Sequence, residues 1–277
     1  MLTLSLYRRC AAALSQTWTL KKPRTSFVVL AGIAVFMMSP TSALAQEQPL
    51  RVLATGVFAT TLRSLAPPFE KATGYKLEVT IANAGQVAAR LAAGESADIV
   101  MTSAASTKTL AKQGVLVADE APIGKMRLGV AVLAAPMPDL TTIEAFKRLL
   151  LSADRIAYID PNGGGTSGPF FEKMFASLGV SEAVQAKAIL CKDGAEVVKA
   201  VASGHAPIGM TQASEIISAR DVKFAGFLPD PVNLITDYSA STTTSSANSK
   251  MAASFLQFVT GPVGAERLRA AGWTIER

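Results

Sequence analysis

Four turns hold the residues best suited to chemistry, and each turn follows a predicted strand and leads into a predicted helix. The longest, residues 160–168, reads DPNGGGTSG, and the others cover residues 55–58, 83–86 and 192–194. Their hydroxyl and amide side chains are neutral hydrogen-bond donors. Free backbone N–H groups and the positive end of the helix dipole favour an anion at a helix start. The turns therefore predict a site for a small anionic or polar ligand.

The same inventory argues against catalysis and metal binding. His205 is the only histidine, so no site that needs two imidazoles can form and a Ser/His/Asp triad has one candidate base. Cys10 and Cys191 are too few for a thiolate zinc cluster. The sequence lacks a G-x-S-x-G elbow, and the pair Asp119-Glu120 fits a solvated turn. We therefore predict no enzyme, no metal and no cofactor, with His205 exposed and Cys191 buried on a strand.

The glycine-rich turn over residues 160–168 does not match a nucleotide site. It lacks the lysine and hydroxyl that close a P-loop, and it is not a G-x-G-x-x-G after the first strand with an acidic residue about 20 positions on. Two interpretations remain open. The glycines either make a tight turn between a strand and a helix, or they bring backbone N–H groups to a bound anion.

The positive charge of the chain is concentrated at its beginning. Lysine and arginine number 27 against 21 acidic residues, a net charge of +6. Residues 1–45 hold five of the basic residues and no acidic one, with an apolar run over residues 27–38 and an A-x-A at residues 43–45. This order is typical of a secretory signal peptide, and the apolar run is shorter than the roughly 20 residues of a membrane span. We predict cleavage after Ala45 and a periplasmic protein, with an uncleaved anchor as the alternative.

Loss of this leader removes the argument for an acidic partner. It leaves 22 basic against 21 acidic residues, so we predict no nucleic-acid partner. Residues 1–20 exceed what a leader requires, and we hypothesise that translation starts downstream of Met1.

Strand and helix patterns alternate through the rest of the chain and predict a three-layer α/β fold with parallel strands. Residues 239–249 (SASTTTSSANS) fit a linker or an edge strand equally well. The expected strands cover residues 50–54, 76–81, 97–102, 129–134, 155–159, 188–191, 207–211 and 224–227, and the expected helices cover residues 60–73, 86–93, 142–151, 168–178, 195–202, 215–219 and 251–268.

Four segments carry a resemblance to a known family. They read RVLATGVFATTLRSLAPPFEKATGYKLEV, QVAARLAAGESADIVMTSAASTKTLAKQGVL, HAPIGMTQASE and FLQFVTGPVGAERLRAAGWTI. In this order they resemble the periplasmic molybdate-binding proteins, a branch of the type II solute-binding proteins of ABC importers. The resemblance covers nearly all of the chain after the leader.

The resemblance implies two Rossmann-like α/β lobes joined by a hinge, the type II periplasmic binding fold. The first lobe would cover residues 46–126 and be completed by residues 231–277, and the second would cover residues 127–230. A ligand would lie between the lobes, and their closure would signal to an ABC permease in the inner membrane. We expect the protein to act as a monomer.

The resemblance also suggests where the ligand binds. The family's hydroxyls after the first two strands fall at Val57 and at Ala84 or Gly85, and its ligand-binding tyrosine falls at Gln212. The predicted ligand-binding residues are Thr55, Gly56, Val57, Asn83, Gly85, Gln86, Thr166, Ser167, Gly168, Gly194 and Gln212.

The leading hypothesis is a receptor that captures a molybdate-like oxyanion for an ABC importer. The lost hydroxyls keep two alternatives open, a receptor of the same fold for a small organic acid or other polar metabolite, and a ligand sensor without a transport role. A carboxylate ligand would be met by basic side chains. The candidates are Arg63, Lys108, Arg127 and Lys192.

Overall fold

The computed structural model describes residues 48–276, so the predicted leader and its cleavage point lie outside the described residues. Within that range, the helices lack the combined length and apolar character that crossing a membrane requires. The strands are β1 (Leu50–Thr55), β2 (Leu77–Ala82), β3 (Ile99–Ser103), β4 (Ala121–Val132), β5 (Ile156–Ile159), β6 (Ala188–Cys191), β7 (Ile208–Gln212), β8 (Lys223–Phe227) and β9 (Ile235–Thr242).

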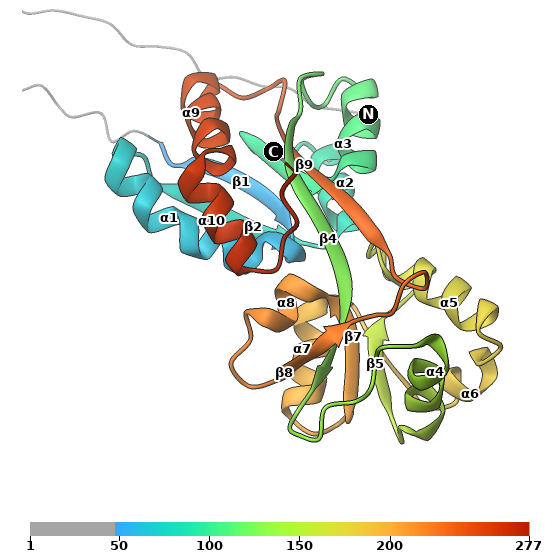
Figure 1. The fold of residues 1–277 in the computed structure, drawn as a ribbon. Helices are drawn as coiled ribbons and strands as arrows, with labels where there is room; N and C mark the ends of the chain where they lie inside the picture. Colours follow the sequence, from blue (N-terminus) through green and yellow to red (C-terminus); the bar gives the residue numbers. More distant parts are fainter. Residues whose placement is uncertain (1–47, 277) are drawn as a thin grey trace, which may run out of the picture. The chain divides into compact units, whose positions relative to one another are not determined.

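The helices connect these strands in the alternating order that the sequence predicts (Figure 1). A short 3-10 helix, η1 (Gly56–Phe58), leads from β1 into the first of them. The α-helices are α1 (Ala59–Thr73), α2 (Ala84–Ala92), α3 (Ala104–Lys112), α4 (Ile143–Ser152), α5 (Gly168–Ser177), α6 (Ser181–Gln185), α7 (Gly194–Ala202), α8 (Ala213–Ile217), α9 (Ser249–Thr260) and α10 (Pro262–Ala270).

The strand order among the described residues is β2-β1-β3-β9-β4-β7-β5-β6, with β8 also paired to β4. Strand β1 is parallel to β2 and β3, which confirms the predicted βαβαβ opening. Strand β5 is parallel to β6 and β7, whereas β7, β8 and β9 are antiparallel to β4. Parallel strands bring their carboxyl ends to one edge, where the predicted turns begin.

Strand β4 is longer than the strand predicted over residues 129–134. It pairs with β9 over residues 121–127 and with β7 over residues 128–132, and Figure 1 shows it running beside β9. The pattern hides its first half because Pro122 is atypical of an inner strand and Lys125 and Arg127 are charged. We propose that this change of partner after Arg127 marks the hinge between the two lobes. The first lobe would comprise residues 46–126 and 231–277, and the second would comprise residues 127–230.

The end of the chain requires two corrections. Part of the polar run 239–249 belongs to β9, which lies between β3 and β4 and is therefore neither a linker nor an edge strand. Two of its hydroxyls are buried and hydrogen-bonded, since Ser239 donates to Glu120 and Ser241 donates to the carbonyl of Val117. The single helix predicted over 251–268 is two helices, because Gly261 is extended and proline begins α10.

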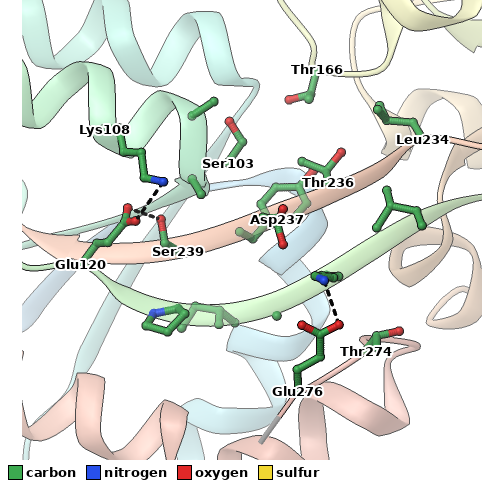
Figure 2. A pocket seen from close by; sticks show the side chains of 18 of the residues that line it. Ser103, Lys108, Glu120, Thr166, Leu234, Thr236, Asp237, Ser239, Thr274 and Glu276 are labelled. Carbon is green, nitrogen blue, oxygen red and sulfur yellow. Dashed lines mark hydrogen bonds and ion pairs between the residues drawn. The ribbon is translucent and has the colours of Figure 1, made fainter.

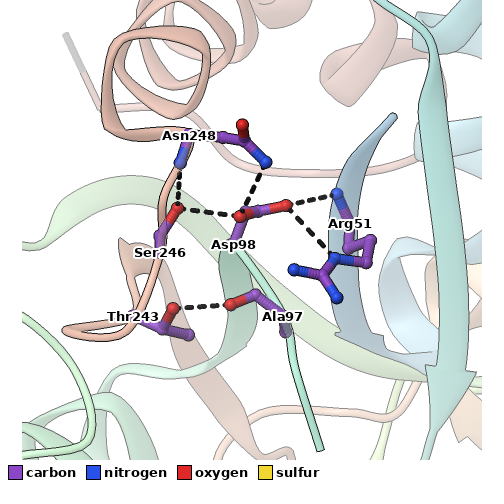
Figure 3. Close-up of polar contacts among 6 residues, drawn as sticks. All are labelled: Arg51, Ala97, Asp98, Thr243, Ser246 and Asn248. Atoms are coloured by element: carbon purple, nitrogen blue, oxygen red, sulfur yellow. Dashed lines mark hydrogen bonds and ion pairs between the residues drawn. The ribbon is translucent and has the colours of Figure 1, made fainter. Parts of the chain in front are cut away.

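A buried carboxylate ties the strands of the first sheet to the segment that precedes α9 (Figure 3). Asp98 has no exposed side-chain surface and accepts hydrogen bonds from the backbone N–H of Arg51 (2.9 Å), from Ser246 Oγ (2.8 Å) and from Asn248 Nδ2 (3.2 Å). Burial alone would raise the pKa of Asp98, but these hydrogen bonds and the nearby Arg51 guanidinium hold it below its ordinary value. The ionised form is therefore the one that the fold stabilises.

We expect Asp98→Asn to lower the free energy of unfolding at pH 7 by about 1–2 kcal/mol, because an amide nitrogen replaces an oxygen that accepts. The lowered pKa also fixes the pH dependence. The wild type gains this stability above the unfolded-state pKa of about 3.9 and loses it as the pH falls through the lower folded-state value. Urea unfolding at pH 7 and pH 3 should show a smaller difference between variant and wild type at pH 3. The exposed Asp221→Asn is the control, and an equal difference at both pH values would contradict this assignment.

Candidate functional site

Two pockets contain predicted ligand residues, and the larger of them, about 920 Å³, lies along β4 and β9 (Figure 2). Four of its charged side chains form two ion pairs. The Nζ of Lys108 lies 3.8 Å from the Oε1 of Glu120, and the Nζ of Lys125 lies 2.7 Å from the Oε1 of Glu276. Of the predicted ligand residues, it contains Thr166 alone.

The smaller pocket, about 350 Å³, lies where the carboxyl ends of β1, β2, β5 and β7 meet the starts of α1, α2 and α7. It gathers nine of the eleven predicted ligand residues, eight from the four turns and one from the end of β7. They are Thr55, Gly56, Val57, Asn83, Gln86, Thr166, Ser167, Gly194 and Gln212. Gly85 and Gly168 are not among its lining residues. We take this pocket as the candidate site.

The turn after β2 uses its polar groups within the protein. Asn83 and Gln86 form a capping box at the start of α2, and the Nδ2 of Asn83 donates to the carbonyl of Gly163 (2.9 Å). The N–H of Gly85 donates to the carbonyl of Gly164 (2.9 Å). This turn therefore holds the glycine-rich turn in place, which explains why Gly85 lies outside the pocket lining.

The other predicted residue outside the lining, Gly168, is the first residue of α5 and is buried. A Cβ atom at this position would stand 2.5 Å from the carbonyl oxygen of Asp160 and 2.8 Å from the Cα of Pro161. Only glycine lets the glycine-rich turn close on itself there. Its role is thus to shape the turn that presents Thr166 and Ser167 to the pocket.

Gln212 is the most informative of the predicted side chains. It ends β7, is 6% exposed, and its Oε1 is buried without a hydrogen-bond partner among the described residues. A buried acceptor left unpaired costs stability, so this position favours a ligand that donates a hydrogen bond. Nearby, Ser214 Oγ donates to the carbonyl of Val57 (2.9 Å), which fixes the turn after β1.

Glu215, which we did not predict, completes the wall next to Gln212. Its Oε2 accepts a hydrogen bond from Thr211 Oγ1 (2.6 Å), and burial, followed by the charge of Asp193, raises its pKa to about 7. A Cβ atom at Gly56 would stand 2.6 Å from its Oε1, and one at Gly194 would overlap the carboxyl group. The two glycines therefore make room for this side chain. In the sequence, the only signal for this contact was the spacing of four residues between Thr211 and Glu215.

The four basic candidates separate into two groups. Arg63 and Lys192 line the candidate pocket, with Lys192 also paired to Glu196 at 2.7 Å. Lys108 lies in the larger pocket, and Arg127 lies over the ring of Phe227. Only the first two can therefore meet an acid in the candidate pocket.

The predictions for the isolated histidine and cysteine are confirmed. His205 is exposed and lies 2.6 Å from the Oγ of Ser203, and Cys191 is buried at the end of β6. Burial raises the pKa of the Cys191 thiol to about 11, so it is a poor nucleophile. Residues 48–276 also contain no group of three or more histidine, cysteine, aspartate or glutamate residues that could hold a metal ion.

Comparison with known proteins shows which family the chain belongs to. Residues 50–274 match the family model of bacterial extracellular solute-binding proteins. An aconitate isomerase from a Pseudomonas species is 30% identical over 90% of this chain and 96% of its own. The molybdate-binding protein ModA of Escherichia coli K12 is 23% identical over 90% of this chain and 97% of its own.

A solved structure supports the same fold. The periplasmic molybdate-binding protein of Azotobacter vinelandii matches with a TM-score of 0.70 and 23% identity, covering 82% of this chain and all of its own. The α/β architecture predicted from the sequence is thereby confirmed. The chain belongs to the bacterial extracellular solute-binding proteins and has the type II periplasmic binding fold.

Proposed function

We propose that this protein binds a small organic acid in the candidate pocket and delivers it to an ABC permease. The observation that carries the proposal is the wall formed by Gln212 and Glu215, which presents a buried carbonyl oxygen and a carboxyl group. A fully ionised oxyanion such as molybdate offers only acceptors and cannot satisfy the oxygen of Gln212. An organic acid with a hydroxyl or a protonated carboxyl group can.

Two further features support an organic ligand. Arg63 and Lys192 line the pocket and are suited to carboxylates, which basic side chains bind by charge-assisted hydrogen bonds. The volume of about 350 Å³ falls in the range of roughly 300–1,000 Å³ of pockets for small organic molecules. Aconitate, the acid in the name of the Pseudomonas relative, is the first ligand to test, and in its partly protonated form one carboxyl O–H can donate to the oxygen of Gln212.

A thermal-shift comparison of acids and oxyanions tests the proposal. A ligand at a hundredfold excess over its Kd stabilises a protein by about 2.7 kcal/mol. We expect cis-aconitate or trans-aconitate to raise the melting temperature, and molybdate, tungstate and sulfate to leave it unchanged. The reverse result would favour the oxyanion receptor that the similarity to ModA suggests.

Gln212→Leu should weaken binding of the acid about 10- to 100-fold in calorimetry, because it removes the paired amide while keeping most of the side-chain volume. Gln113→Leu, an exposed glutamine at the end of α3, is the matched control and should bind as the wild type does. Equal affinity in the two variants would remove Gln212 from the site.

Export to the periplasm is part of the proposal and rests on the order of basic, apolar and A-x-A segments in residues 1–45. Amino-terminal sequencing of protein released from the periplasm should begin at Gln46. A start before Gln46 in membrane-bound protein would instead indicate an uncleaved anchor.

Delivery to a permease is a separate part of the proposal. If the protein supplies the acid to an ABC permease, growth on that acid should require the permease.

A further inference from the structure

We infer that the ligand of the candidate pocket carries an aliphatic tail, and that Ile81 at the end of β2 selects for this tail. The inference rests on the proposed function and deepens it, because it narrows the small organic acid to one with a polar head and an apolar end. The ligand class is a carboxylic acid whose polar groups lie together at one end of a hydrocarbon chain.

The fold leaves the side chain of Ile81 uncovered inside the ligand site. Ile81 is 40% exposed and lines the candidate pocket. It is not part of any hydrophobic cluster of the described residues. The other large apolar side chains that are exposed in residues 48–276 lie outside this pocket, and they are Val117, Leu133, Met137, Leu151, Leu190, Ile235 and Val263.

The alternation of β2 explains why Ile81 reaches the pocket. Side chains two residues apart lie on the same face of a strand, so Leu77, Val79 and Ile81 share one face. Leu77 and Val79 pack against the cluster that contains Leu62 and Leu65 of α1. Ile81 stands further along the same face, near the carboxyl end of β2, and lines the pocket instead of joining the cluster.

Small apolar side chains from two helices line the same pocket. Ala195 and Val198 are three residues apart and therefore lie on one face of α7. Ala195 is exposed and Val198 is half-buried. Ala59 at the start of α1 adds a further small side chain. Together with Ile81, these residues form an apolar face of the pocket that a hydrocarbon chain can contact.

The buried polar groups of the pocket suit the head of the ligand. Thr55, Ser167 and Gln212 line the pocket and are each at most 6% exposed. Their side chains can hydrogen-bond a hydroxyl and a carboxylate, and Arg63 and Lys192 supply positive charge. A molecule with all its polar atoms at one end satisfies these groups and leaves its tail for the apolar face.

The apolar face distinguishes acids of equal charge by the length of their tails. Each CH₂ group that it removes from water strengthens binding about fourfold, which corresponds to about 0.8 kcal/mol. A polar group placed against Ile81 would lose its water without a hydrogen bond in return. The pocket therefore favours an acid with an aliphatic tail over an acid that is polar throughout.

Calorimetry with a series of 2-hydroxy acids tests the inference, because the head and its charge stay constant while the tail grows. The probes are lactate, 2-hydroxybutyrate, 2-hydroxypentanoate and 2-hydroxyhexanoate. We expect the affinity of the wild type to rise about fourfold for each added CH₂ group. The heat-capacity change of binding should become more negative along the series, since this change reports apolar burial.

Ile81→Thr keeps the branched side chain but replaces part of its apolar surface with a hydroxyl group. This variant should lower the affinity for 2-hydroxyhexanoate about 5- to 10-fold more than the affinity for lactate. Ile235→Thr is the matched control, because Ile235 is 54% exposed and lines the larger pocket instead. It should bind the whole series as the wild type does.

Three results would overturn the inference and leave the proposed acid receptor intact. They are equal affinity of the wild type for the four 2-hydroxy acids, an equal loss for lactate and 2-hydroxyhexanoate in Ile81→Thr, and binding of aconitate without binding of any 2-hydroxy acid. If neither aconitate nor any 2-hydroxy acid bound, the proposed function itself would fail.

Discussion

Phe58→Ala should lower the free energy of unfolding by about 3–5 kcal/mol, the range measured when a large buried aromatic side chain is removed. Phe58 has no exposed surface and ends the turn after β1. Its ring stacks on Trp273 at a centroid distance of 4.8 Å and meets Tyr238 edge to face at 5.5 Å. The two partners come from the end of the chain, so the variant also loosens the link between β1 and the closing segment.

Urea denaturation followed by circular dichroism measures this effect as a shift of the midpoint with an unchanged slope. Leu190→Ala is the control, because that side chain is 52% exposed and its loss should change stability by less than about 0.5 kcal/mol. Because Tyr238 also lines the candidate pocket, ligand affinity of the folded Phe58→Ala protein should fall as well. Similar midpoints for the two variants would show that Phe58 is not a centre of the core.

The sequence was a good guide to the fold where local patterns and the fold agree. The opening βαβαβ unit, with its glycine stop after α1, was predicted to within two residues at each boundary. Local sequence patterns did not predict the first half of β4 or the position of β9, because these strands contain charged residues or many hydroxyls. These strands are stabilised by pairing with distant segments and by bonds such as that from Ser239 to Glu120, which no local pattern reveals.

In the candidate site, too, the features that local patterns determine were predictable and those that depend on long-range contacts were not. The turns were predictable because helix starts after parallel strands share one edge of a sheet, and nine of the eleven residues line one pocket. The sequence did not predict which groups bind within the protein and which face the pocket. Asn83 and Gly85 donate hydrogen bonds to the glycine-rich turn. Glu215 lines the pocket from a five-residue helix whose direction depends on long-range packing.

Gly168→Val should lower the free energy of unfolding by about 3 kcal/mol, at the upper end of the usual cost of overpacking. The clash is with backbone atoms, since a Cβ atom would stand 2.5 Å from the carbonyl oxygen and 2.9 Å from the carbonyl carbon of Asp160. A side chain there cannot rotate away, so residues 160–167 must move. Urea denaturation of the variant and the wild type measures the loss.

The same substitution should weaken the proposed acid at least tenfold in calorimetry, because the turn that moves carries Thr166 and Ser167 into the pocket. Gly163→Ala is the control from the same turn, since its nearest neighbour would stand 3.3 Å from the added Cβ atom and can adjust. If Gly168→Val lost stability but bound the acid with wild-type affinity, the hydroxyls of this turn would not contact the ligand. The site would then rest on the other residues that line the pocket, with Thr55 and Gln212 among its buried polar groups.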